Sequence, residues 1–167
     1  IISLVISENS NAGGLRHAEK NGILGFHVPL PKIDDKSERR VKHEIQIQQI
    51  LKDENVELIV LNGYMRIISN WLVSRWKGRI VNIHPSLLPD FPGAHAHRDV
   101  LAAGSKNSGC TVHLVDEGVD SGPILGQSSV LVYPDDNLQS LQNRVKKEEH
   151  KLYPKILDDL CSGLISL

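Results

Sequence analysis

The chain has 167 residues, 40% of them hydrophobic, with 19 lysines and arginines against 20 aspartates and glutamates. This length and composition indicate one globular domain with a substantial core. A net charge of -1 provides no basic field for a nucleic-acid backbone, and no apolar run approaches the roughly 20 residues that a membrane-spanning helix needs. The two cysteines, Cys110 and Cys161, fit neither a disulfide framework nor a paired metal site, which favours the cytoplasm. We therefore expect no nucleic acid and no membrane among the partners, and the oligomeric state stays open.

Short β-branched runs alternate with helical stretches, which is typical of an α/β fold: a Rossmann-like, mostly parallel open sheet with helices on both faces. The predicted strands are 1–7, 25–28, 56–61, 80–83, 110–115 and 124–132. The predicted helices are 15–21, 37–54, 69–76, 98–103 and one that begins near Asp136 or Asn137. The strand 56–61 has the most buried pattern because it is short and nearly all apolar. The last two strands are expected to pair across the acidic turn 116–122.

Ligands of open parallel sheets bind beyond the carboxyl ends of the strands, so the residues after each strand are candidates. After the strand 56–61, Gly63 permits close backbone approach and Arg66 can meet an anion. Taken alone, a surface turn with a solvated arginine is the simpler interpretation of this stretch.

The end of the strand 80–83 is the most informative place in the chain. Side chains alternate along a strand, so Asn82 and His84 point to the same side, and Pro85 favours an extended backbone at His84. The amide can hydrogen-bond a developing oxyanion, and the imidazole titrates near neutral pH, as a proton-transfer catalyst needs. Taken alone, the pair is explained equally well by an asparagine and a histidine whose hydrogen bonds are purely structural.

The acidic turn 116–122 holds three carboxylates and two glycines. We predict that Asp120 turns inward, where it could hold the imidazole of His84 in place and favour its protonated form. A plain solvated turn and a single cation ligand are the alternatives, and the spacing of an EF-hand is absent.

Four of the eight histidines lie between positions 84 and 113. Their spacing matches no His-Glu-x-x-His arrangement, so we expect no metal. We interpret His95 and His97 as forming local hydrogen bonds at a helix start, and His113 as a histidine satisfied inside the core.

The apolar residues of the last predicted helix form one stripe at helical spacing. They are Leu138, Leu141, Val145, Leu152 and Ile156. Glu149 fills a gap in this stripe, and a carboxylate there needs a partner. It is either half of an intrahelical pair with Lys146 or a polar clamp for a substrate.

Several motifs, in the same order along the chain, resemble the phosphoribosylglycinamide formyltransferases (glycinamide ribonucleotide transformylases) of the formyltetrahydrofolate-dependent formyltransferase family. The most specific is Asn-Ile-His-Pro-Ser-Leu-Leu-Pro-Asp-Phe-Pro-Gly at 82–93, followed by Gly-Cys-Thr-Val-His at 109–113 and the turn 116–124. Segments 63–69 and 144–154 look like the family's folate-loop and late-helix motifs. The resemblance covers essentially the whole chain.

This resemblance implies direct transfer of a formyl group from 10-formyltetrahydrofolate to the amine of glycinamide ribonucleotide, through a tetrahedral intermediate, in purine biosynthesis. By position it implies that Asn82, His84 and Asp120 are catalytic. The folate-binding residues it implies are Arg40, Met65, Arg66, Ile67, Ile68, Asn82, Asp116, Glu117, Gly118, Val119 and Asp120. The ribonucleotide-binding residues it implies are Lys146, Lys147, Glu148 and Glu149. Both substrates are anionic, which suits local cations such as Arg66 and Lys146 on an otherwise neutral protein.

One departure from the family concerns the start of the chain. The family begins with a further strand and a glycine-rich loop whose N–H groups hold a phosphate, before the strand that 1–7 resembles. We therefore expect residues 1–167 to be a single formyltransferase domain that is incomplete at its N-terminal end and lacks the first βα unit. A formyltetrahydrofolate hydrolase, which shares the catalytic trio, and a non-catalytic folate- or nucleotide-binding module remain the alternatives.

Overall fold

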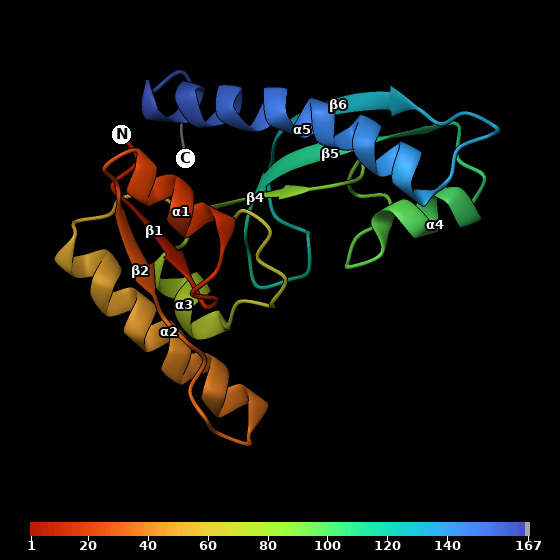
Figure 1. Cartoon of the computed structure of the whole chain (residues 1–167). Helices are drawn as coiled ribbons and strands as arrows, with labels where there is room; N and C mark the ends of the chain where they lie inside the picture. Colours follow the sequence, from red (N-terminus) through yellow and green to blue (C-terminus); the bar gives the residue numbers. More distant parts are fainter. Residues whose placement is uncertain (166–167) are drawn as a thin grey trace. The chain divides into compact units, whose positions relative to one another are not determined.

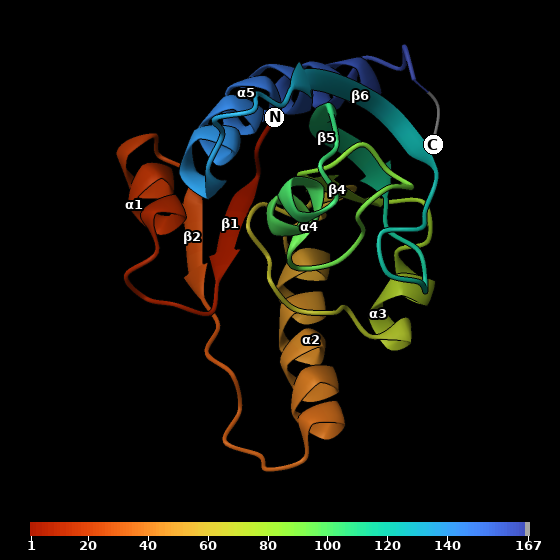
Figure 2. The same ribbon diagram turned by 90° about the vertical axis from the view of Figure 1, so that its right-hand side faces the viewer.

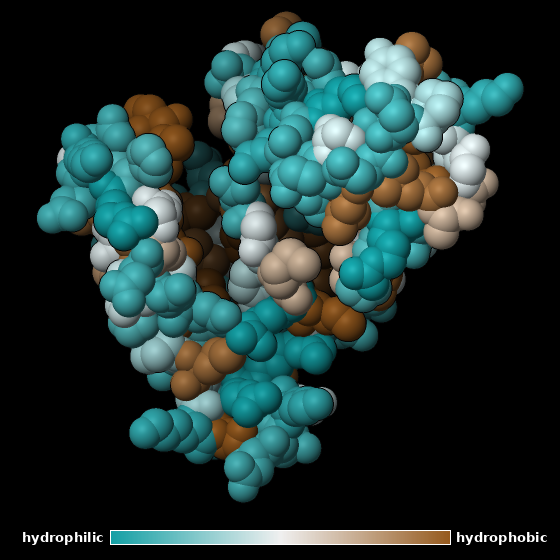
Figure 3. All heavy atoms as spheres, turned by 45° about the vertical axis from the view of Figure 1, so that its right-hand side comes forward, coloured by the Kyte–Doolittle hydropathy of each residue, from teal (hydrophilic) through white to brown (hydrophobic). Residues whose placement is uncertain are grey.

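The computed structural model describes residues 1–165, and these divide into two compact units. The first unit comprises Ile1–Glu57 and Ile68–Arg75, and the second comprises Leu58–Ile67 and the chain from Trp76 onwards. The strands form two sheets, one of order β1-β2 and one of order β3-β4-β5-β6. Among residues 1–165, no helix is long and apolar enough to cross a membrane, and on the face shown in Figure 3 hydrophilic residues cover most of the surface.

The first unit is built around a parallel strand pair. β1 (Leu4–Ser7) and β2 (Leu24–His27) lie side by side, and the helix α1 (Gly13–Lys20) connects them and packs on both (Figure 2). Two more helices complete the unit, α2 (Lys36–Asp53) and α3 (Asn70–Arg75). The carboxylate of Asp35 caps α2 by accepting the N–H of Glu38.

The face of α2 that is buried is unusually polar. Nε2 of the buried His43 lies 2.8 Å from the carbonyl oxygen of Val28. Glu44 is fully buried and binds Ser69, the residue that precedes α3. One carboxylate oxygen of Glu44 accepts the N–H of Ser69 at 2.8 Å, and the other accepts its hydroxyl. A buried carboxylate therefore joins α2 to the start of α3.

The second unit contains a four-stranded sheet. Its strands are β3 (Ile59–Val60), β4 (Ile80–His84), β5 (Asn107–Leu114) and β6 (Ile124–Leu131). β3 is parallel to β4, whereas the pairs β4–β5 and β5–β6 are antiparallel. The helix α4 (Ala96–Ala102) follows β4, and α5 (Leu138–Cys161) lies along β5 and β6 (Figure 1).

Two apolar clusters hold α5 to this sheet. One cluster consists of Val81, Val112, Tyr153 and Ile156, and the other consists of Val100, Cys110, Leu141 and Val145. The hydroxyl of Tyr153 adds a polar contact, because it donates to the carbonyl oxygens of Leu61 at 2.8 Å and Val81 at 3.0 Å. The predicted apolar stripe of the last helix is thus the face that packs in these clusters, except at its first residue, Leu138, which is 40% exposed.

The structure confirms the α/β class and the predicted hairpin. All five predicted helices are present, with bounds within a few residues of those expected. One strand prediction is wrong: the buried strand expected at 56–61 is reduced to the two residues of β3, and Val60 is 42% exposed. β3 pairs with β4 alone among the described strands, and its two side chains differ in burial: Ile59 is partly buried, whereas Val60 is exposed.

Candidate active site

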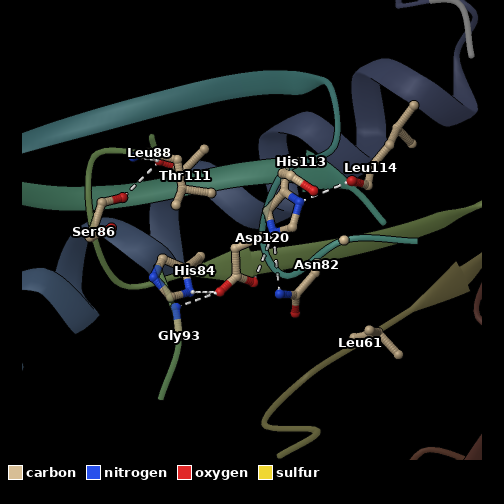
Figure 4. A network of polar contacts seen from close by, with 12 residues as sticks. Leu61, Asn82, His84, Ser86, Leu88, Gly93, Thr111, His113, Leu114 and Asp120 are labelled. Carbon is tan, nitrogen blue, oxygen red and sulfur yellow. Dashed lines mark hydrogen bonds and ion pairs between the residues drawn. The ribbon is translucent and has the colours of Figure 1, made fainter. Parts of the chain in front are cut away.

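The candidate site lies on the antiparallel pair β4–β5 (Figure 4). The register of this pair places Asn82 opposite His113 and His84 opposite Thr111. Asn82 and His84 point to the same side of β4, as the alternation predicted, and Asp120 reaches them from the turn between β5 and β6.

His84 is buried, and each of its ring nitrogens faces an oxygen. Its Nδ1 lies 3.2 Å from Oδ2 of Asp120, and its Nε2 lies 2.9 Å from the carbonyl oxygen of Phe91. A protonated imidazole has two N–H donors and can satisfy both oxygens, whereas either neutral form would direct a nitrogen lone pair at one of them. The geometry therefore matches an imidazolium.

Asp120 is turned inward, as the sequence predicted. Its backbone has a φ of +52°, in the left-handed region, and its side chain is 15% exposed. Besides meeting His84, Oδ2 accepts the N–H of Gly93 at 2.8 Å. Asp120 therefore links the turn after β5 to the loop after β4.

The remainder of the acidic turn has a structural role. Oδ1 of Asp116 accepts the N–H of Gly118 at 3.0 Å and the hydroxyl of Ser121 at 2.8 Å, which closes the turn on itself. A Cβ on Gly122 would lie 1.9 Å from the carbonyl oxygen of Leu114, so only glycine fits where the turn meets β5. These contacts present Asp120 at the tip of a tight turn.

His113 is a site residue that sequence reasoning missed. It is buried, as expected of a core histidine, but its Nε2 lies 3.3 Å from Nδ2 of Asn82 and 3.7 Å from Oδ1 of Asp120. Its Nδ1 lies 2.9 Å from the carbonyl oxygen of Leu114, and burial is the main cause of its lowered pKa. A neutral ring that donates from Nδ1 can accept at Nε2 from the Asn82 amide, which helps to fix the orientation of that amide. The antiparallel register was the signal that could have found it.

The interpretation of His95 and His97 as residues with local hydrogen bonds is wrong. The side chain of His95 makes no capping bond to α4, and Nδ1 of His97 is buried with no hydrogen-bond partner in residues 1–165. The pKa of His97 is lowered by burial and, to a smaller extent, by the charge of His84. Within the same residues, no three potential metal-binding side chains come together.

The residues expected to bind folate are divided between the two units. Met65 and Ile67, which follow β3, are 80% and 61% exposed. The turn residues Glu117 and Val119 are exposed as well. Arg40, on α2, and Ile68, before α3, belong to the first unit.

The predicted ribonucleotide segment lies on α5, where two adjacent glutamates differ sharply. Burial raises the pKa of Glu149, and the charges of His150, Lys146 and His84 oppose this shift. The pKa of Glu148 is lowered instead, by Lys151 at 2.7 Å and Ser128 at 3.1 Å. Among the described residues, the intrahelical ion pair of this segment thus joins Glu148 to Lys151, and partial burial disfavours the charged form of Glu149.

A family model described as formyl transferase matches residues 1–157. The chain belongs to the formyl transferase family. It is 40% identical over 159 residues to the phosphoribosylglycinamide formyltransferase of Bacillus subtilis (strain 168), in an alignment that covers 95% of this chain and 79% of that protein. It is 44% identical over 167 residues to the trifunctional purine biosynthetic protein adenosine-3 of Gallus gallus, of whose length it spans 16%.

A solved formyltransferase has the same fold. The crystal structure of phosphoribosylglycinamide formyltransferase from Bacillus halodurans matches with a TM-score of 0.89 and 36% identity, covering 100% of this chain and 84% of that one. The candidate site on β4 and β5 lies inside the range that the formyl transferase model matches.

Proposed function

We propose that this protein transfers a formyl group from 10-formyltetrahydrofolate to the amine of glycinamide ribonucleotide, a step of purine biosynthesis. The observation that carries the proposal is the contact between His84 and Asp120 beside Asn82, in a chain of the formyl transferase family. Both cysteines are free thiols, which fits a reaction in the reducing cytoplasm.

In the proposed mechanism, the amine attacks the formyl carbon and the carbonyl electron pair moves to oxygen. An N–H of Asn82 donates to the oxyanion and the positive charge of the nearby His84 ring stabilises it, while Asp120 orients that ring and balances its charge. The tetrahedral intermediate collapses when the carbon–N10 bond breaks, the folate nitrogen takes up a proton and the attacking nitrogen loses one. No covalent bond to the enzyme forms.

Folate is proposed to bind at the exposed segment Met65–Ile68 and the turn Asp116–Asp120, with Arg40 as a further contact. The apolar side chains of Met65 and Ile67 are exposed at the end of a strand, where a flat ring can pack on them. The ribonucleotide is proposed to bind at Lys146–Glu149, where the carboxylate of Glu149 can accept hydroxyl groups and lysine can meet an anion.

A steady-state assay of the full-length protein tests this function. The purified protein is mixed with 10-formyltetrahydrofolate, with and without glycinamide ribonucleotide, and tetrahydrofolate, formyl product and formate are measured. Formylated ribonucleotide and tetrahydrofolate should form in equal amounts, and only when both substrates are present. Release of formate without the ribonucleotide would instead identify a hydrolase, and binding of both compounds without turnover would identify a non-catalytic module.

A further inference from the structure

The hydroxyl of Thr111 is fully buried beside His84 and makes three hydrogen bonds (Figure 4). It donates to the carbonyl oxygen of Ser86 at 2.7 Å and accepts the N–H of Leu88 at 3.0 Å. It also accepts a side-chain N–H of Gln127, on β6, at 2.9 Å. One side chain of β5 thus binds both ends of the turn that follows His84.

Gln127 holds the same turn from the next strand. Its Nε2 donates to Thr111 and also to the carbonyl oxygen of Leu88, at 2.8 Å. Three backbone groups of residues 86–88 therefore find their partners on two side chains, and without these side chains they would be buried and unsatisfied.

The turn held by Thr111 and Gln127 leads directly to the oxygen that faces His84. The hydroxyl of Ser86 lies 2.5 Å from the carbonyl oxygen of Asp90 and 3.2 Å from that of Phe91. Phe91 has a φ of +54°, which is rare for a bulky residue and requires support from its surroundings. Its carbonyl oxygen then faces Nε2 of His84 at 2.9 Å.

We propose that Thr111 and Gln127 are positioning residues for formyl transfer, which rests on the proposed function. They hold the turn 86–91 so that the Phe91 carbonyl accepts from Nε2 of His84, and this contact keeps Nδ1 directed at Asp120. If the turn shifts, the imidazole loses one of its two acceptors and with it the orientation that the reaction needs. The two residues act through His84 and touch neither substrate.

Thr111→Val tests this inference, because it keeps the shape of the side chain and removes the hydroxyl. We expect kcat to fall about 10²-fold, as for a catalytic group displaced by roughly 1 Å, with KM for both substrates unchanged within about twofold. Thr111→Ser restores the hydroxyl and should recover most of kcat. Gln127→Leu removes the second support and should lower kcat about tenfold.

The chain offers a matched control on the same strand. Ser108 is also fully buried on β5, but its hydroxyl has no hydrogen-bond partner in residues 1–165. Ser108→Ala should therefore leave kcat and KM unchanged. If Ser108→Ala lowers kcat as much as Thr111→Val, the loss reflects disturbance of the strand and the inference is overturned.

A second measurement reports on His84 without turnover. In ¹H–¹⁵N NMR of the free protein, we expect a slowly exchanging Nε2–H of His84 that is lost in Thr111→Val and kept in Thr111→Ser and Ser108→Ala. If Thr111→Val does not fold, Gln127→Leu provides the comparison. If the His84 signal and kcat both stay unchanged in Thr111→Val and in Gln127→Leu, the inference is overturned. If the signals change as expected but the unaltered protein transfers no formyl group, only the proposed function is overturned.

Discussion

The carboxylate of Asp120 lies 3.2 Å from the buried imidazole of His84. It accepts from both the ring and the N–H of Gly93, so it supplies charge and fixed direction together. Its left-handed φ is an unfavourable backbone conformation for a residue other than glycine, and the contacts of the rest of the turn stabilise it. Such an arrangement is expected where function needs a particular orientation.

Asp120→Asn should remove the charge while keeping the size of the side chain. We expect kcat to fall by about 10²–10⁴-fold, the usual contribution of proton-transfer groups, with tetrahydrofolate binding measured by calorimetry largely kept. Asp159→Asn, on an exposed ion pair of α5 with Lys155, is the control and should behave as the unaltered protein. A kcat near the unaltered value in Asp120→Asn would remove Asp120 from the mechanism.

Glu149 and Glu148 provide a second test at this scale, because their pKa values shift in opposite directions. A raised folded-state pKa means that the stabilising form is the protonated one, so Glu149 costs stability at pH 7 and the cost disappears as the pH falls toward 4.5. Glu149→Gln should therefore raise the free energy of unfolding at pH 7 by about 1 kcal/mol. It should also raise KM for the ribonucleotide.

Glu148→Gln is the matched control and should lower the stability at pH 7. Lys151 and Ser128 lower the pKa of its carboxyl from 4.5, so this stability is fully present above pH 4.5 and is lost as the pH falls through the lowered pKa. Urea unfolding at several pH values measures both variants. If both substitutions change the free energy of unfolding by the same amount and in the same direction, the two glutamates do not differ in the way described.

Part of this site follows from local rules and part does not. The common side of Asn82 and His84 follows from strand alternation, and Pro85 extends that alternation to the strand end. The contact with Asp120 spans 36 positions; the composition of the acidic turn indicated which carboxylate turns inward, but no local rule fixes a contact over that separation. His113 was missed because an apolar strand predicts a core position, while its contact with Asn82 depends on the antiparallel register.

At the scale of elements, the hairpin β5–β6 positions the turn that carries Asp120. The strands meet so closely at Gly122 that an added Cβ would overlap the backbone oxygen of Leu114. At Gly118, by contrast, an added Cβ would meet the hydroxyl of Ser121, a side chain that can move at the expense of its hydrogen bond to Asp116. The two glycines of one turn therefore differ in what they tolerate.

Gly122→Ala should destabilise the protein by about 1–3 kcal/mol, the range for overpacked sites. Since relief of the overlap must move the turn, kcat should fall as well. Gly118→Ala, the control in the same turn, should cost less stability. Thermal unfolding and kcat measured on both variants decide this, and a Gly122→Ala protein with normal stability and activity would contradict the close packing.

The helix α5 and the strand β3 show where element prediction succeeds and fails. The start of α5 was predictable because its capping contacts are local. The side chain of Asn137 accepts the N–H of Ser140, and the hydroxyl of Ser140 accepts the N–H of Asn137. The burial of β3 was not, because an apolar run predicts burial only if the fold covers both sides of it. Val60 of β3 is 42% exposed, and whether the face it points to is covered depends on the tertiary fold and not on the run itself.

For the whole molecule, different ionisable groups change the free energy of unfolding in opposite directions as the pH falls, although the net charge is close to zero. Burial lowers the pKa values of His113 and His97, so the unfolded chain binds protons more readily than the folded one below about pH 6.5. These groups make stability fall as the pH decreases from 7. Glu149 has the opposite effect, because its protonation relieves a cost in the folded state.

We therefore expect the free energy of unfolding, measured with urea between pH 7.5 and 5 (roughly the range in which histidine titrates), to decrease toward acid. His97→Gln removes one buried histidine and should flatten the dependence, whereas Glu149→Gln removes the opposing group and should steepen its acid end. The strong ion pair of Asp136 with Arg144 holds the pKa of that carboxyl far below its usual range, so this pair stays intact throughout and adds no slope. Stability that rises toward acid, or a slope that His97→Gln leaves unchanged, would show that buried histidines do not govern the response of this protein to pH.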